Sequence, residues 1–155
     1  MGRQGRPTKG EPFSIRLSTP TELYVDAEAR RTRRSRSAVV EDLTEEAART
    51  RRFPGIGFRE GGDGTRSAWV TGSGFYVWML IEALQDFGSM DSLLAAYDHL
   101  AKRHVELAVA YYREYAAEID AAIAENRRPL QERRLLYPFI QVEYVDNKAG
   151  AAHPA

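Results

Sequence analysis

The stretch of sequence that decides the fold is FSIRLSTPTELYVDAEARRTRRSRSAVVEDL, which covers residues 13–43. At its start, the apolar Phe13, Ile15 and Leu17 alternate with polar side chains, the period of two that is typical of a short strand with one buried face. Two helical patterns follow, separated by a run of arginines. The stretch therefore predicts a strand, Phe13 to Ser18, followed by two helices.

Both predicted helices carry recognisable start signals. Ser18 suits the N-cap of a helix that runs to about Arg33, with Pro20 in its first turn. Ser35 or Ser37 caps a second helix, predicted from Ala38 to about Arg51. Its apolar positions follow a helical repeat, and they are Val39, Val40, Leu43, Ala47 and Ala48.

A single strand with two short helices cannot bury its own apolar face. An isolated strand has no pairing partner, and two short helices make a thin core. The segment therefore predicts a homodimer, in which the strands of two chains pair. In this order of elements, residues 13–52 resemble the ribbon-helix-helix family of bacterial repressors and antitoxins.

The resemblance implies an antiparallel two-stranded ribbon that enters the major groove of an operator DNA. Side chains facing outward from the ribbon would then contact base edges, and these are Ser14 and Arg16, with Ser18 at the end of the strand. Arg16 is the main candidate, since a guanidinium bonds guanine in a bidentate manner. Pro12 stands where the family usually has a third outward polar residue, so that contact is in doubt.

The resemblance also implies phosphate binding at the start of the second helix. Backbone amides and the helix dipole favour an anion there, and neighbouring arginines add positive charge. The residues concerned are Arg33, Arg34, Ser35, Arg36 and Ser37. An ordinary edge strand and a solvated arginine-rich helix face are the alternative interpretation of the same residues.

The remainder of the chain predicts a second, helical domain. Residues 1–12 read as a flexible basic arm, 13–53 as the DNA-binding domain, 54–127 as a helical domain and 128–155 as a tail. Within 54–127 we expect a hairpin over Ile56 to Val70, then helices over 75–87, 90–97 and 101–125, the last split near Tyr115. The second and third of these predict a helix-turn-helix-like pair. The fold class is thus mainly α.

This second domain resembles a family of small helix-turn-helix or winged-helix-like antitoxins that pair with PIN-like ribonuclease toxins. The matching pieces are Pro54-Gly55-Ile56, Arg66, Gly72 to Trp78, and Tyr111-Tyr112 before Glu118-Ile119-Asp120. Ala116-Ala117 departs from the family's proline, which would favour one fused helix. The resemblance implies a protein toxin as partner.

The tail contains an apolar segment with two interpretations. Its apolar residues would form a strand that docks on a partner, or one that folds back on the hairpin of the second domain. The candidate partner-binding residues are Phe139, Ile140, Val142 and Tyr144.

Charge is unevenly distributed, and the sequence shows no nucleophile-base pair. Residues 1–53 carry 12 Lys/Arg against 8 Asp/Glu, whereas the rest carries 10 against 14, which suggests different partners unless it is ordinary surface scatter. The chain has no cysteine, and His99 and His104 lie five apart without a further zinc ligand. We therefore expect no enzyme, cofactor or metal site. Without a signal peptide or an apolar span, the bacterial cytoplasm, at the nucleoid when bound to DNA, is the expected location.

Together these patterns predict a DNA-binding antitoxin and autorepressor that neutralises a ribonuclease-like toxin. The alternative is a stand-alone transcription or plasmid-maintenance regulator. In that case the second domain would serve oligomerisation or a second DNA contact through Lys102, Arg103 and Arg113.

Overall fold

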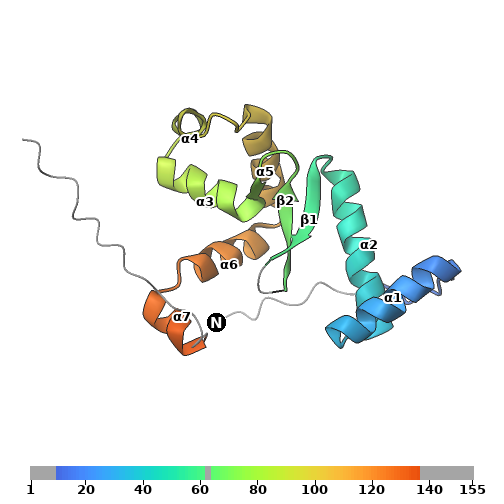
Figure 1. The fold of residues 1–155 in the computed structure, drawn as a ribbon. Helices are drawn as coiled ribbons and strands as arrows, with labels where there is room; N and C mark the ends of the chain where they lie inside the picture. Colours follow the sequence, from blue (N-terminus) through green and yellow to red (C-terminus); the bar gives the residue numbers. More distant parts are fainter. Residues whose placement is uncertain (1–9, 62–63, 137–155) are drawn as a thin grey trace, which may run out of the picture. The chain divides into compact units, whose positions relative to one another are not determined.

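A computed structural model describes residues 10–61 and 64–136 of the 155-residue chain. The chain divides into two compact units, residues 1–54 and 55–155. The described residues form seven helices and a three-stranded antiparallel sheet (Figure 1), so the expected mainly helical class is confirmed. Among the described helices, none combines the length and apolar character that a membrane crossing requires.

The first unit contains two helices, α1 (Thr19–Thr32) and α2 (Arg36–Arg52). Ser18 is the N-cap of α1, as predicted, although its hydroxyl lies 2.9 Å from the Thr21 hydroxyl and caps no backbone amide. Ser35 is the N-cap of α2 and accepts a hydrogen bond from the Ala38 amide at 3.1 Å. The second helix thus begins two residues earlier than predicted, and Ser37 lies in its first turn.

The turn between these helices is unusually tight. Arg33 ends α1 in the left-handed region, with a φ of 54°. The Arg34 amide then donates back to the carbonyl of Ala29 at 3.0 Å, which satisfies one of the carbonyls at the helix end. This turn places Arg34 and Arg36 directly after α1 and before the body of α2.

The strand predicted over Phe13 to Ser18 is absent from the single chain. Residues 10–18 form neither helix nor strand, and no described residue makes a backbone hydrogen bond to residues 10–17. Phe13 and Ile15, which were expected in the core, are 85% and 59% exposed. The physical reason is that a strand needs a partner strand, and the described residues of this chain offer none.

The second unit begins with a three-stranded meander. Its strands are β1 (Ile56–Glu60), β2 (Arg66–Val70) and β3 (Phe75–Tyr76), in the order β1-β2-β3. The predicted hairpin is therefore confirmed, while β3 is an element that the sequence pattern did not indicate. In the antiparallel register, Gly57 faces Trp69, and Trp69 faces Tyr76.

Five helices follow the sheet. They are α3 (Val77–Phe87), α4 (Met90–Ala96), α5 (Lys102–Glu114), α6 (Ala116–Asn126) and α7 (Leu130–Leu136). The predicted break at Tyr115 is confirmed, so Ala116-Ala117 does not fuse α5 with α6. The structure also shows α7, which was not predicted. The strand expected around Phe139, Ile140, Val142 and Tyr144 lies outside the described residues.

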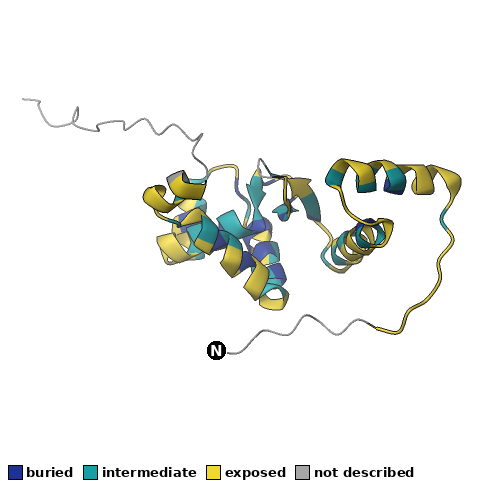
Figure 2. Ribbon diagram, turned by 90° about the horizontal axis from the view of Figure 1, so that it is seen from below, coloured by how far each residue is buried: buried dark blue, intermediate teal, exposed yellow. Residues whose placement is uncertain are grey.

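The core of the second unit lies between the sheet and the helices. Helix α3 contacts α4, α5, α6, β2 and β3, and α5 also contacts β2. Buried residues gather here, whereas the first unit buries few (Figure 2). Side chains with at most 1% exposure come from both layers, and they are Ile56, Ala68, Val70, Val77, Leu80, Leu93, Val105, Ala108 and Tyr111.

Candidate nucleic-acid interface

The arginine-rich turn between α1 and α2 is fully at the surface. Each of the five predicted phosphate-binding residues is exposed, and these are Arg33, Arg34, Ser35, Arg36 and Ser37. The turn brings them together because the left-handed Arg33 reverses the chain within three residues. The structure therefore places these five candidates at one end of the helix pair.

Two of these arginines form ion pairs within the first unit. Arg34 pairs with Asp42, and Arg36 pairs with Glu22 at 2.7 Å and with Asp26 at 2.8 Å. Hydrogen bonds to Asp42 and Glu22, with the nearby negative charges, raise the pKa of Arg34 and of Arg36 above the ordinary value. Both guanidinium groups are thus charged and oriented. Asp42 and Glu22 are exposed, so other anions can replace them, whereas Asp26 is half-buried.

The N-terminus of α2 supplies amide donors beside these arginines. The first helical amide with a backbone partner is that of Val39, which donates to the Ser35 carbonyl at 3.1 Å. The Ser35 hydroxyl accepts a hydrogen bond from the Ala38 amide. Within the described residues, the amides of Arg36 and Ser37 have no acceptor, and at the positive end of a 17-residue helix such amides favour an anion.

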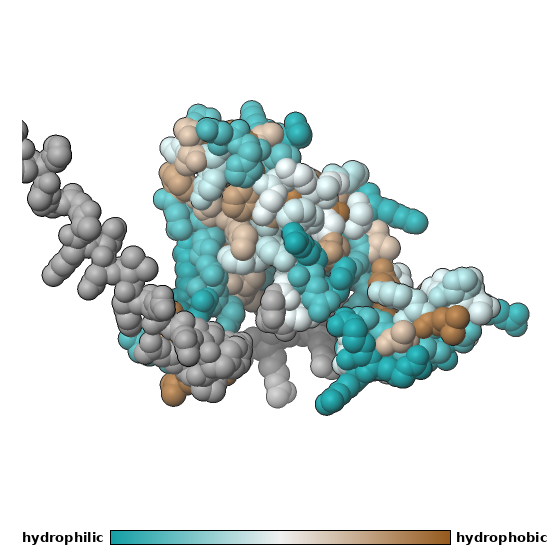
Figure 3. All heavy atoms as spheres, viewed as in Figure 1, coloured by the Kyte–Doolittle hydropathy of each residue, from teal (hydrophilic) through white to brown (hydrophobic). Residues whose placement is uncertain are grey.

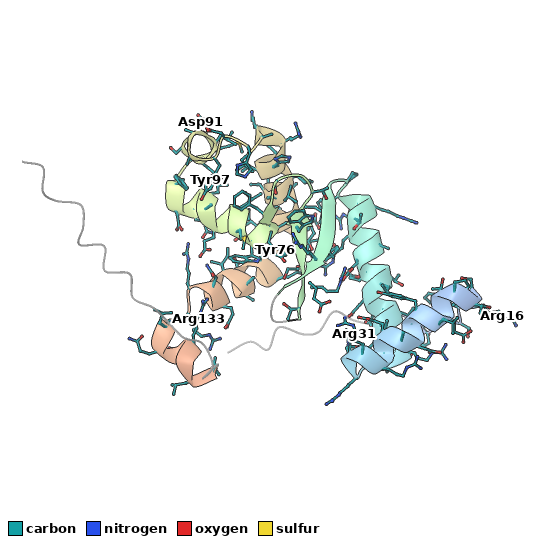
Figure 4. All side chains as sticks on the ribbon, viewed as in Figure 1. Arg16, Arg31, Tyr76, Asp91, Tyr97 and Arg133 are labelled. Atoms are coloured by element: carbon teal, nitrogen blue, oxygen red, sulfur yellow. The ribbon has the colours of Figure 1, made fainter. Side chains whose placement is uncertain are left out.

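The predicted base-reading residues lie on a different part of the unit. Ser14, Arg16 and Ser18 are exposed on the extended segment that leads into α1. In Figure 4, Arg16 lies near the start of α1 and Arg31 lies near its end, so one helix separates Arg16 from the arginine-rich turn. Within one chain the structure does not bring the two sets together.

Exposed apolar side chains also lie in the first half of α1. Outside the predicted strand, Leu23 and Tyr24 on α1 are 64% and 55% exposed, and apolar atoms reach the surface over this helix pair (Figure 3). The sequence interpretation did not single out these two residues. The sequence could have indicated these residues, because they lie next to Val25 on a helix that has few other large apolar side chains.

The two described histidines, His99 and His104, both make contacts within the second unit. His104 is buried, and its Nδ1 accepts a hydrogen bond from the Ala101 amide at 3.2 Å. Desolvation by burial, followed by the charges of Arg103 and His99, lowers the pKa of His104. The His99 ring stacks on Phe75, with 5.7 Å between centroids. No cluster of three potential metal ligands occurs in the described part of the chain.

Comparison with known proteins returned no match to any family model, any curated protein or any solved structure. The two resemblances drawn from the sequence therefore stay predictions.

Proposed function

We propose that the chain is a sequence-specific DNA-binding protein whose first unit acts as a homodimer. The observation that carries this proposal is the imbalance between apolar content and burial in that unit. Among the described residues of that unit, 10–54, only Val25 and Val39 are buried, at 0% and 4% exposure, whereas Phe13, Ile15, Leu23 and Tyr24 are more than half exposed. Apolar groups at this density favour association with another surface.

A second copy is the partner that fits the extended segment. Residues 10–17 offer unpaired backbone donors and acceptors, and their side chains alternate between apolar and polar. Pairing with the same segment of a second chain would satisfy the backbone and cover Phe13, Ile15 and Leu17 on one face. Ser14 and Arg16 would then project from the opposite face, which is the ribbon of the ribbon-helix-helix arrangement.

On DNA, the two sets of candidate residues would have separate tasks. Arg16, Ser14 and, less directly, Ser18 would meet base edges in the major groove. The free amides at the start of α2, with Arg33, Arg34 and Arg36, would hold phosphates on either side. DNA phosphates would compete with Asp42 and Glu22 for these arginines, an exchange that costs little because the pairs are exposed.

Binding-site selection from a random duplex pool with the full chain tests the proposal. We expect one enriched, pseudo-palindromic sequence, because two-fold protein symmetry imposes two-fold symmetry on the site. Arg16→Ala should remove the preference while keeping salt-dependent nonspecific binding. Arg51→Ala is the matched control, since Arg51 is an exposed arginine in the last turn of α2, at the end of that helix far from the arginine-rich turn. A monomeric chain that enriches no sequence would refute the proposal.

We further propose a protein partner for the end of the chain, as expected of an antitoxin. Leu130, Leu135 and Leu136 of α7 are 43%, 84% and 53% exposed, in a helix of only seven residues. A helix this short with exposed leucines gains stability by docking on another surface. The resemblance of the second domain makes a PIN-like ribonuclease the first partner to test.

Co-expression with a toxin encoded by the neighbouring gene tests this second proposal. The full chain should copurify with the toxin and restore growth, and Leu135→Asp combined with Leu136→Asp should lose both effects while DNA binding is kept. Retention of the toxin by the double variant would contradict this role for α7. Absence of any adjacent toxin gene would favour the stand-alone regulator.

A further inference from the structure

The sheet of the second unit has one covered and one open face. Ile56, Ala68 and Val70 alternate onto the face that the helices bury, each with at most 1% exposure. The register puts Gly57, Trp69 and Tyr76 side by side on the opposite face, where Trp69 and Tyr76 keep part of their surface accessible. A large aromatic area is therefore available on a rigid element.

Three rings form a row across this open face, which we call the aromatic row: Trp69, Tyr76 and Trp78. The centroids of Trp69 and Tyr76 are 6.4 Å apart with the rings edge to face. Those of Tyr76 and Trp78 are 6.5 Å apart with an angle of 14° between the planes. Tyr76 lies at the end of β3, where the chain enters α3 (Figure 4). The row thus continues from the sheet onto the first turn of α3.

The row carries one cation and unused hydrogen-bond donors. The Arg59 guanidinium lies 5.2 Å from the centroid of the Trp69 ring, and among the described residues it has no carboxylate partner. Neither indole N–H, of Trp69 or of Trp78, donates within the described part of the chain, and neither is a buried unsatisfied group. Each is therefore free to bond an acceptor on a bound molecule.

We propose that the aromatic row binds an extended, proline-containing peptide that carries an acidic side chain. A polyproline II segment offers rigid rings that stack on aromatic side chains, and its backbone carbonyls have no internal partners. These carbonyls match the two indole donors. An acidic side chain matches Arg59, the cation of this face that lacks an ion pair.

A single-stranded nucleic acid is the other ligand that stacks on such rows, and charge disfavours it. Nucleic-acid binding relies on several phosphate contacts. Residues 55–155 carry 10 Lys/Arg against 14 Asp/Glu. The neighbouring Arg66 already donates to the Phe58 carbonyl at 3.1 Å. The open face therefore has too little free positive charge to follow a phosphate backbone.

Tryptophan fluorescence of the full chain gives a direct test, because its two tryptophans both belong to the aromatic row. The probe is a blocked oligoproline decapeptide with a central pair of glutamates. We expect a saturable change in emission. The same peptide with lysines in place of glutamates should bind about fivefold more weakly, the scale of one exposed charge pair.

Variants assign the signal to named residues. Arg59→Ala should remove the difference between the two peptides, and Tyr76→Ala should weaken binding of the glutamate peptide about tenfold through loss of ring contact. Arg113→Ala, on the outer surface of α5, should change neither affinity. Circular dichroism checks that each variant is folded.

Three results would overturn the proposal. One is an emission spectrum that the glutamate peptide leaves unchanged. Another is tighter, steeply salt-dependent binding of a thymidine decamer, which would make the row a nucleic-acid site. The third is a change in emission on simple dilution of the chain, which would show that a second copy covers the row. Because the proposal does not depend on the first unit, none of these results decides whether the first unit recognises duplex DNA.

Discussion

In the second unit, fully buried side chains come from strands and helices alike, whereas the first unit buries little beyond Val25 and Val39. The first unit also has a smaller share of apolar residues, and it exposes Phe13, Ile15 and Leu23 instead of burying them. The difference lies in how far each unit buries its apolar side chains within one chain. The second unit has a buried core of its own, whereas the first leaves apolar side chains exposed that a second chain could cover.

The largest expected effect is on association of the first unit. Ile15→Asp would place an unpaired carboxylate in the proposed dimer core, so we expect dimerisation and specific DNA binding to weaken by more than ~100-fold. Thr50→Asp, an exposed position on α2, is the control with the same charge change. Sedimentation equilibrium measures the dimer. Equal dimer dissociation constants for the two variants would show that Ile15 faces solvent in the active protein.

The next largest expected effect is on the stability of the second unit. Tyr111 has 0% exposure, and its hydroxyl lies 3.4 Å from Glu118 Oε1. Tyr111→Ala should lower the free energy of unfolding by about 3–5 kcal/mol, the usual cost of removing a large buried ring. Tyr111→Phe keeps the ring and should cost about 1 kcal/mol. Thermal unfolding measures both, and a similar loss for the two would indicate that the ring contributes little.

A smaller effect distinguishes the two helix starts of the first unit. Ser35→Ala removes a side-chain bond to the Ala38 amide and should cost about 1 kcal/mol. Ser18→Ala should cost only a few tenths of a kcal/mol, because the Ser18 hydroxyl caps no amide. Denaturant midpoints at one fixed protein concentration test the order, and the reverse order would contradict it.

The smallest effect is a pH dependence confined to the second unit. Burial lowers the pKa of His104 in the folded chain, so the unfolded chain binds a proton more readily. Stability is therefore complete above the ordinary histidine pKa of about 6.5 and is lost as the pH falls below it. His104→Gln should flatten the pH dependence of the unfolding midpoint between pH 7 and 5. An unchanged slope would assign the dependence to other groups.

Local patterns predicted most of the helices and the hairpin. The break at Tyr115, the N-cap at Ser35 and the pairing of Ile56 with Val70 all depend on neighbouring residues, which a sequence displays directly. The two-residue strand β3 was missed because its pairing with Trp69 and Val70 depends on the turn between β2 and β3. Helix α7 was missed because its apolar residues look like part of a tail.

The candidate site was predicted less completely than the fold. The arginine-rich turn follows from the sequence, but the pairing of Arg36 with both Glu22 and Asp26 requires two helices to meet and has no local signal. The aromatic row was not predicted from the sequence. Because side chains alternate along β2, Trp69 lies on the other face of the sheet from Ala68 and Val70. The open face can therefore be identified once the register is known.

Arg33 adopts a backbone conformation that is costly for any residue with a side chain. A left-handed φ of 54° disfavours every residue with a Cβ, and a glycine would adopt it at about 1 kcal/mol less. The first unit thus keeps strain in its tightest turn and retains an exposed guanidinium there. An Arg33→Gly chain would be more stable and less able to hold phosphate. Selection for stability alone would therefore remove the proposed phosphate contact first at this position.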